Sequence, residues 1–67
     1  MDVRRRLGLN VQRLRRAKGW SQEEFAELAG LHRTYVSGVE RGVRNPTITV
    51  VEKLAVTLGI GIGDLAE

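Results

Sequence analysis

The stretch SQEEFAELAGLHRTYVSGVE, residues 21–40, predicts two short amphipathic helices joined by a tight turn at Gly30. The first helix opens with a capping box, because Ser21 and Glu24 stand three residues apart and each can bond the backbone N–H of the other. Its buried face is expected to consist of Phe25, Ala26, Leu28 and Ala29. Gly30 then ends the helix, since glycine is the preferred residue just past a helix C-terminus.

The second of the two helices is expected over about residues 33–41, with Val36 and Val39 turned inward. His32 precedes it where Ser, Thr or Asp is the preferred cap, so this helix has a weaker start than its neighbour. Because the two valines account for the buried face, Tyr35 should point away from the core. Two angled helices, the second with polar residues at its start, can enter the major groove of DNA.

Helical spacing continues on both sides of this pair, and no stretch shows the alternation of a strand. One helix is expected over about residues 3–18. A loop follows the central pair at residues 43–47, because the residue before a proline is pushed out of helical geometry. A second capping box, Thr49 with Glu52, predicts the start of a fourth helix. A last short turn is expected at residues 62–66, which makes the chain an all-α bundle.

Composition excludes several classes of protein. The 67 residues make a single domain, residues 1–67, with its central helix pair at about 21–41. There is no cysteine, so disulfides and thiolate metal sites are excluded and a cytoplasmic location is expected. No apolar run approaches the roughly 18 residues of a membrane span, and no signal peptide is recognisable. His32 has no cysteine or clustered carboxylate near it in sequence, so no enzyme activity, metal or cofactor is expected.

The charge of the chain is unevenly placed. The formal net charge is +3, but residues 1–20 alone carry +6. Residues 21–30 carry −3, residues 31–45 carry +2 and residues 46–67 carry −2. A basic first helix and a basic second member of the pair suit a polyanion on one face. The simpler alternative is an ordinary solvated helix face.

Four residues of the second central helix are candidates for reading DNA bases. The guanidinium of Arg33 can bond O6 and N7 of one guanine together, although a surface arginine can also contact only a phosphate. Thr34 offers a hydroxyl and a methyl group to a base edge. An exposed Tyr35 can pack on a base edge or bond a phosphate, and Ser37 can reach bases or backbone.

A further set of residues suits the phosphate backbone. Gln22 stands at the start of a helix, where an amide and free N–H groups can meet a phosphate. Arg44 and Asn45 follow the second central helix in a loop. Such contacts set register and affinity without reading sequence. Taken singly, each of the three is also compatible with an ordinary polar loop residue.

Arg15 and Glu40 suggest a structural contact. Arg15 follows the core residue Leu14, and Glu40 follows the core residue Val39. We therefore predict an ion pair that fixes the second central helix against the first helix of the chain, not a ligand-binding pair.

The apolar tail indicates an interface between two chains. Ile60, Ile62 and Leu65 lie in a segment that also contains Gly61 and Gly63 and is too short to form a stable helix alone. One domain core of this size has room for one or two of these side chains. The remainder would form an exposed apolar patch, and a two-fold partner could cover it. A dimer contact through Ile60, Ile62 and Leu65 is therefore predicted.

The segment KGWSQEEFAELAGLHRTYVSGVERGVRNPTITVVEKLAVTLG, residues 18–59, resembles the Cro/C1-type (xenobiotic-response-element) helix-turn-helix family. The resemblance extends from about residue 7 to residue 65. Within the family, HRTYVSGVERGVRNPTI at residues 32–48 is most similar to the controller proteins of restriction–modification systems. The matching motif positions are Arg15, Ser21, Gln22, Ala26, Gly30, Val36, Glu40, Gly42, Pro46, Leu54 and Ala55.

This resemblance implies a five-helix, lambda-repressor-like DNA-binding domain that acts as a homodimer through its fourth and fifth helices. The double-stranded operator would be near-palindromic, because a two-fold dimer places two recognition helices in successive major grooves. The resemblance implies neither a membrane partner nor a small-molecule effector. Carried over by position, the base-facing residues would be Arg33, Thr34, Tyr35 and Ser37, and the phosphate-binding residues Gln22, Arg44 and Asn45.

The function expected from sequence is a sequence-specific transcriptional regulator, with a restriction–modification controller as its narrower form. One alternative is the antitoxin of a toxin–antitoxin pair, although the chain has little room for a toxin-binding segment. A second alternative is a protein-interaction adaptor of the same fold. Arg33, Gln22 and Arg44 argue against the adaptor, because it would have no use for DNA-binding side chains.

Overall fold

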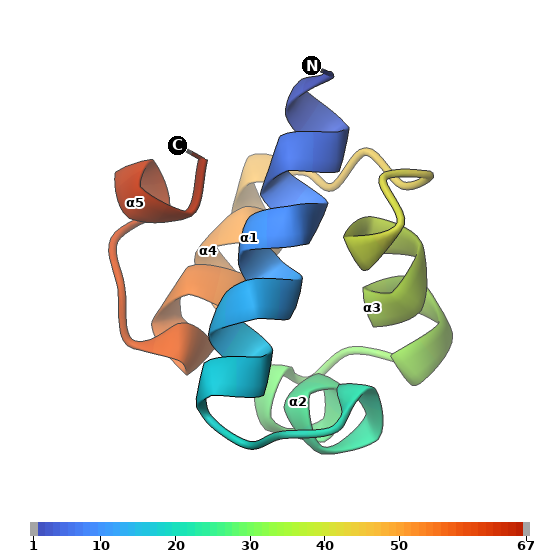
Figure 1. Ribbon diagram of the computed structural model, residues 1–67, viewed down its shortest axis with the longest axis vertical. Helices are drawn as coiled ribbons and strands as arrows, with labels where there is room; N and C mark the ends of the chain where they lie inside the picture. The colour runs from blue at the N-terminus through green and yellow to red at the C-terminus, as the bar shows by residue number, and fades with distance from the viewer. Residues whose placement is uncertain (1, 67) are drawn as a thin grey trace.

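The computed structural model describes residues 2–66 of the chain. Within these residues every regular element is an α-helix, as Figure 1 shows, so the predicted all-α, five-helix fold is confirmed. None of these helices combines the length and the hydropathy that crossing a bilayer requires. The five helices are α1 (Val3–Ala17), α2 (Gln22–Ala29), α3 (Arg33–Glu40), α4 (Ile48–Leu58) and α5 (Ile62–Ala66).

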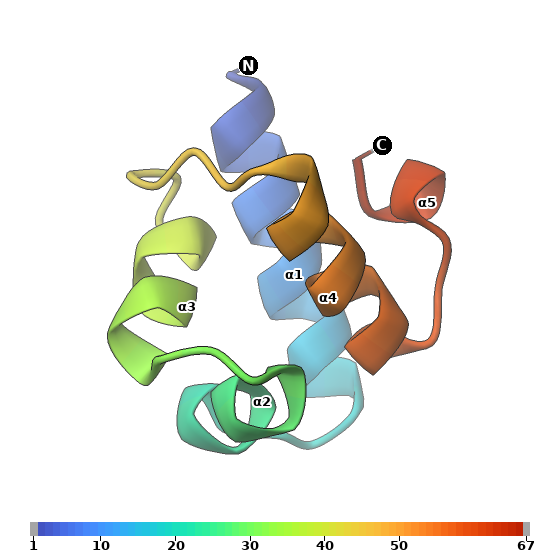
Figure 2. The same ribbon diagram turned by 180° about the vertical axis from the view of Figure 1, so that it is seen from behind.

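Helix α1 is the centre of the arrangement. It packs against α3 on one side and against α4 and α5 on the other (Figures 1 and 2). Helix α2 lies across one end of the bundle and contacts both α3 and α4. The core lies between these helices, and its largest fully buried side chains are Phe25, Leu54, Leu65, Val11, Val36 and Val39.

The start of α2 follows the prediction from sequence. The backbone N–H of Ser21 donates to Glu24 Oε1 at 2.9 Å, and the N–H of Glu24 donates to Ser21 Oγ at 3.0 Å. The first of these bonds lowers the pKa of Glu24, because the backbone N–H stabilises the ionised carboxylate. Helix α3 begins after His32, which makes no side-chain capping bond, as expected from its poor capping chemistry.

The predicted start of α4 is wrong by two residues. The capping residue is Thr47, whose Oγ1 accepts from the N–H of Val50 at 3.3 Å, and not Thr49 with Glu52. Both threonines can cap a helix, and only Thr49 has a glutamate three residues later, so the local pattern favoured the wrong one. The earlier start lengthens α4 by two residues, about half a turn. The buried face of the helix is Val51, Leu54, Ala55 and Leu58.

Leu28 is 59% exposed, so its predicted place in the core is wrong. The buried stripe of α2 runs through Phe25, Ala26 and Ala29. Successive residues turn by about 100° around a helix, which places Leu28 well to the side of a stripe centred on Ala29. Eight residues offer one narrow face to the core, and two alanines and a phenylalanine fill it.

Leu65 has no exposed surface within the single chain, so the predicted dimer contact through its side chain is wrong. Helix α5 folds back onto α1 and α4, and Asn10 of α1 donates from Nδ2 to the carbonyl oxygen of Leu65 at 2.9 Å. The space left between these helices accepts the leucine and so anchors a five-residue helix that is too short to persist alone. Ile60 and Ile62 remain partly exposed.

Gly8 allows α1 and α3 to cross closely. A Cβ added to Gly8 would overlap the backbone carbonyl oxygens of Val39 and Glu40, the latter at 2.6 Å. Both obstructing atoms belong to the backbone of a packed helix, which cannot move aside as a flexible side chain would. The glycine in the middle of α1 therefore sets the distance between α1 and α3.

We expect Gly8→Ala to lower the free energy of unfolding by about 1–3 kcal/mol, because overpacking a close helix crossing outweighs alanine's better helix propensity. Urea denaturation followed by circular dichroism measures this change. Gly63→Ala is the matched control, because Gly63 is also helical and has no atom within 4 Å of an added Cβ. Equal stabilities of the two variants would contradict the proposed crossing constraint.

Candidate nucleic-acid interface

Helices α2 and α3 are joined at Gly30, which adopts φ +71°. L-residues with a side chain rarely occupy this left-handed conformation, so glycine fits the turn. The N–H of Leu31 donates to the carbonyl of Ala26 at 2.8 Å and closes the end of α2. The chain then turns into α3, which lies at an angle to α2 (Figure 2). The predicted pair of angled helices is confirmed.

The exposed side of α3 carries most of the residues predicted to face DNA bases. Arg33 and Thr34 are exposed, and Ser37 is half-buried one turn further along. Val36 and Val39 are fully buried on the opposite side. The start of α3 therefore presents two polar side chains to solvent while its valines hold the helix to the core.

Tyr35 is placed differently from the prediction. It is half-buried and packs against the core at its edge, so it does not point fully away from it. The guanidinium carbon of Arg44 lies 5.6 Å from the centre of the tyrosine ring, within the range of a cation–π contact. One predicted base contact and one predicted phosphate contact thus lie against each other.

Gly38 makes this contact between α3 and the following loop sterically feasible. A Cβ on Gly38 would come within 2.6 Å of Arg44 Cγ, so the arginine stem runs directly over the glycine. The carbonyl of Gly38 accepts from the N–H groups of Val43 at 3.0 Å and Arg44 at 3.3 Å. The loop is therefore folded back onto α3, and Arg44 and Asn45, both exposed, extend the polar surface of the helix.

The predicted ion pair between Arg15 and Glu40 is present. Nε of Arg15 lies 2.6 Å from Oε2 of Glu40, and Nη2 lies 3.0 Å from Oε1, which makes the pair bidentate. The side chains are only 8% and 1% exposed. The hydrogen bond to Glu40 raises the pKa of Arg15, while burial acts in the opposite direction. The pair joins α1 to the C-terminal end of α3.

Two further groups complete the surroundings of this ion pair. Nη1 of Arg15 donates to the carbonyl of Trp20 at 2.7 Å, and Nε2 of Gln22 donates to Oε1 of Glu40 at 3.1 Å. Gln22 therefore ties the start of α2 to the end of α3, a role that sequence reasoning missed. No local pattern could have found it, because Gln22 and Glu40 lie 18 residues apart. The contact between Tyr35 and Arg44 was also missed, although a glycine in the middle of α3 hinted at a close approach.

Among residues 2–66, no group of three or more His, Asp or Glu side chains is placed to hold a metal ion. The polar features brought together are instead the exposed start of α3, the loop folded onto it and the first residues of α2. Arginine, hydroxyl and amide groups on such a surface suit phosphates and base edges.

Comparison with known proteins also points to a DNA-binding surface. A helix-turn-helix family model matches residues 11–65. An uncharacterised helix-turn-helix transcriptional regulator of Sinorhizobium fredii, y4dJ, is 47% identical over 60 residues, which cover 90% of this chain and 78% of that protein.

Solved structures share both the fold and the sequence. The restriction–modification controller protein C.AhdI of Aeromonas hydrophila has a TM-score of 0.88 and 47% identity, over 92% of this chain and 90% of that one. The biofilm regulator SinR, solved in complex with DNA, has a TM-score of 0.86 and 34% identity, over 91% of this chain and 98% of that one. With its two angled helices and these relatives, the chain belongs to the Cro/C1-type helix-turn-helix family of DNA-binding transcriptional regulators.

Proposed function

We propose that this protein is a sequence-specific transcriptional regulator that binds a near-palindromic operator in double-stranded DNA as a homodimer. The observation that carries the proposal is the exposed start of α3, held in place by a buried ion pair at the other end of the same helix. A rigid support suits base recognition, because hydrogen bonds to base edges require a fixed orientation of the side chain. The site of action would be the cytoplasm, and the role would be binding and not catalysis.

The residues divide into two groups by their place on this surface. Arg33, Thr34 and Ser37 would contact base edges from the exposed side of α3, with Tyr35 at the margin of the same surface. Arg44 and Asn45 would contact phosphates from the loop. Gln22 would act through the free backbone N–H groups at the start of α2, because its side-chain amide already donates to Glu40.

The homodimer would use apolar surface near α5. Ile60 and Ile62 remain partly exposed in the folded chain, whereas Leu65 is fully buried in the core. A two-fold contact through these isoleucines would set the spacing of two copies of α3 at about one turn of DNA. Control of a restriction–modification system is the narrower proposal, supported by the similarity to C.AhdI.

Selection of bound duplexes from a random DNA pool tests the proposed function. We expect an enriched sequence with two inverted half-sites whose centres lie roughly 10 base pairs apart. Enrichment of a single half-site would contradict the dimer, and an absence of any enriched sequence would favour the adaptor. An antitoxin would instead require co-purification with a specific toxin and a DNA affinity that changes with it.

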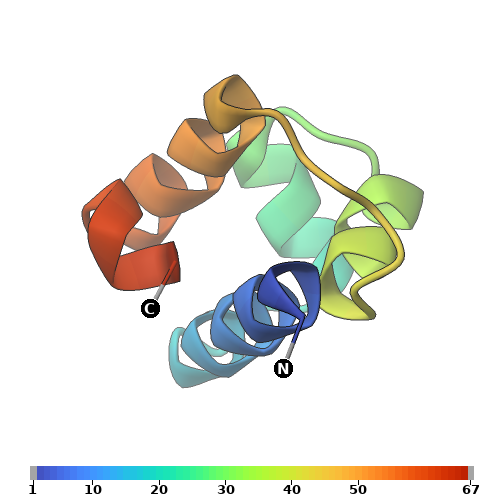
Figure 3. The same cartoon turned by 90° about the horizontal axis from the view of Figure 1, so that it is seen from above.

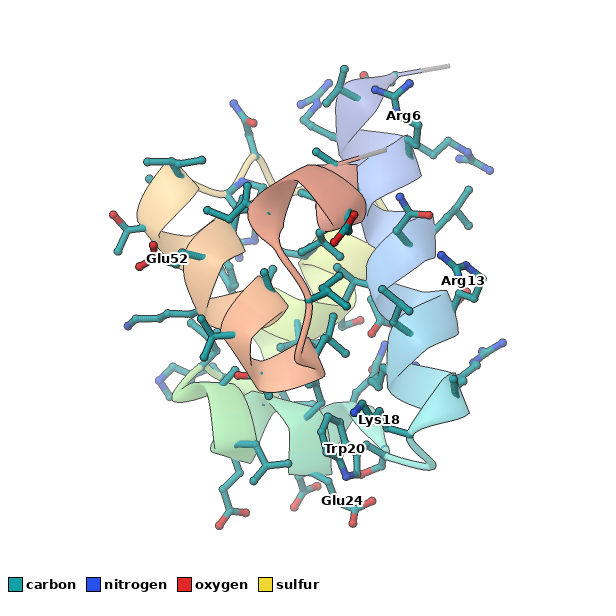
Figure 4. The ribbon with its side chains drawn as sticks, turned by 90° about the vertical axis from the view of Figure 1, so that its left-hand side faces the viewer. Arg6, Arg13, Lys18, Trp20, Glu24 and Glu52 are labelled. Atoms are coloured by element: carbon teal, nitrogen blue, oxygen red, sulfur yellow. The ribbon has the colours of Figure 1, made fainter. Side chains whose placement is uncertain are left out.

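Arg33→Ala is expected to cost about 1–3 kcal/mol of discrimination at one symmetric guanine position while leaving binding to scrambled DNA nearly intact. The reason is that a bidentate arginine recognises one base pair. Fluorescence anisotropy with the selected operator and a scrambled duplex measures the two affinities. Arg13→Ala is the matched control, because it removes the same charge from the side of α1 remote from α3 (Figure 4). If the Arg33 variant keeps the full preference for the operator, Arg33 does not read a base.

A further inference from the structure

The first turn of α1 lies directly against the end of α3. Arg5 and Gly8 are three residues apart and share the side of α1 that faces α3. At Gly8 this side meets the backbone of α3 itself. At Arg5 it meets Gly42, where an added Cβ would lie 3.1 Å from Arg5 Cα. Figure 3 shows the first turn of α1 beside the end of α3 and the loop that follows.

Two structural constraints favour glycine at position 42. Its φ of +76° lies in the left-handed region, and its N–H donates to the carbonyl of Val39 at 3.0 Å to close α3. The missing side chain also lets the backbone of Arg5 approach. The loop that carries Arg44 and Asn45 therefore begins in contact with α1, so the surface at the end of α3 continues onto Arg5.

The junction between the first turn of α1 and residues 41–45 is rich in positive charge. The carboxylates near it already form ion pairs with other arginines. Arg5, Arg41 and Arg44 are all exposed. Asp2 bonds Arg4 at 3.0 Å, and Glu40 is held by Arg15 on the inside of the fold. No ion pair formed within residues 2–66 involves Arg5. An exposed arginine without a carboxylate partner is free to form an ion pair with a phosphate, to which its guanidinium donates hydrogen bonds.

We propose that Arg5 binds a phosphate of the DNA backbone next to those contacted by Arg44 and Asn45, so that the DNA interface extends from α3 onto the first turn of α1. This inference rests on the proposed function and adds a residue to it. The contact would carry no base preference and would contribute affinity and register. It also assigns a role to one part of the basic first helix, whose charge the exposed start of α3 does not explain.

The neighbouring Arg6 provides a sharp control. Arg6 is one residue away and is therefore turned by about 100° around the helix. In Figure 4 it lies on the side of α1 that faces the viewer, whereas α3 lies behind the other helices. Arg5→Ala and Arg6→Ala remove the same charge from the same turn. The packing of Arg5 on Gly42 involves its N, Cα and Cβ atoms, all of which alanine retains. The fold should therefore survive either substitution.

The experiment measures the affinity of the full chain for operator duplex at several salt concentrations. Each phosphate contact contributes about 0.9 to the slope of log affinity against log salt concentration. We expect Arg5→Ala to reduce the slope by about that amount on operator and scrambled duplex alike. We expect Arg6→Ala to change the slope far less and Arg5→Lys to keep most of the wild-type slope, because lysine retains the charge.

Equal slopes for Arg5→Ala and Arg6→Ala would overturn the proposal, because the effect would then follow net charge and not position. An unchanged slope for Arg5→Ala would overturn it as well. Either result leaves the proposed function standing, since the wild-type chain still binds DNA. If the wild-type chain binds no duplex at low salt, the proposed function itself fails, and the role of Arg5 fails with it.

Discussion

Replacing Glu40 with alanine is expected to lower the free energy of unfolding by about 3–5 kcal/mol. The variant leaves the guanidinium of Arg15 buried without its bidentate partner and also removes the acceptor of Gln22. An uncompensated buried charge costs far more than a lost surface contact. Urea denaturation of the purified chain, followed by circular dichroism, gives the value.

Two further variants separate the charge from the packing. Glu23→Ala removes an exposed carboxylate of α2 and should change stability by no more than about 0.5 kcal/mol. The double variant Arg15→Met/Glu40→Leu removes both charges and keeps apolar volume, so it should recover much of the loss. A double-mutant cycle of Arg15→Ala and Glu40→Ala with no coupling energy would show that the pair does not stabilise the fold.

Operator binding provides a second readout of the same pair. The ion pair joins α1 to the end of α3, and Gln22 joins the start of α2 to the same carboxylate. We therefore expect Arg15→Met/Glu40→Leu to lose operator preference even where its stability is restored. The proposed base contacts depend on the orientation of α3, and this double variant removes the directional hydrogen bonds that join the end of α3 to Arg15 and Gln22.

Leu65→Asp is expected to abolish the folded state at 25 °C. Leu65 is among the largest side chains that are fully buried, and it anchors α5 against α1 and α4. A carboxylate placed there would be buried without a partner, a change whose cost is comparable to the whole stability of so small a domain. The measurement is the loss of helical circular dichroism. Leu65→Ala should stay folded with a loss of about 2–5 kcal/mol.

Ile62→Asp distinguishes the core from the proposed dimer contact. Ile62 is the first residue of α5 and is partly exposed, and an acidic residue is tolerated at the start of a helix. This variant should keep its helical signal while sedimentation at micromolar concentration shifts toward monomer and operator affinity falls. A wild-type chain that is monomeric both in solution and on DNA would contradict the dimer and its palindromic operator.

Most features that depend on neighbours three or four residues apart could be predicted from the amino-acid sequence, with the cap of α4 as an exception. The capping bonds between Ser21 and Glu24, the turn at Gly30 and the inward valines of α3 all follow from local backbone chemistry and helical spacing. The Arg15–Glu40 pair was also accessible, because each residue follows a core position in its own helix and the two charges have opposite sign.

Other contacts between residues far apart in the chain could be read only from the three-dimensional packing of the helices. Leu65 is buried within the chain, and not between two chains, because α1 and α4 leave a space that fits it. Thr47 caps α4 in place of Thr49, although local pattern favoured the second threonine. The contact of Gly42 with Arg5 joins residues 37 positions apart. Helical spacing shows which side of a helix is apolar, but the partner of that side depends on how the helices pack in three dimensions.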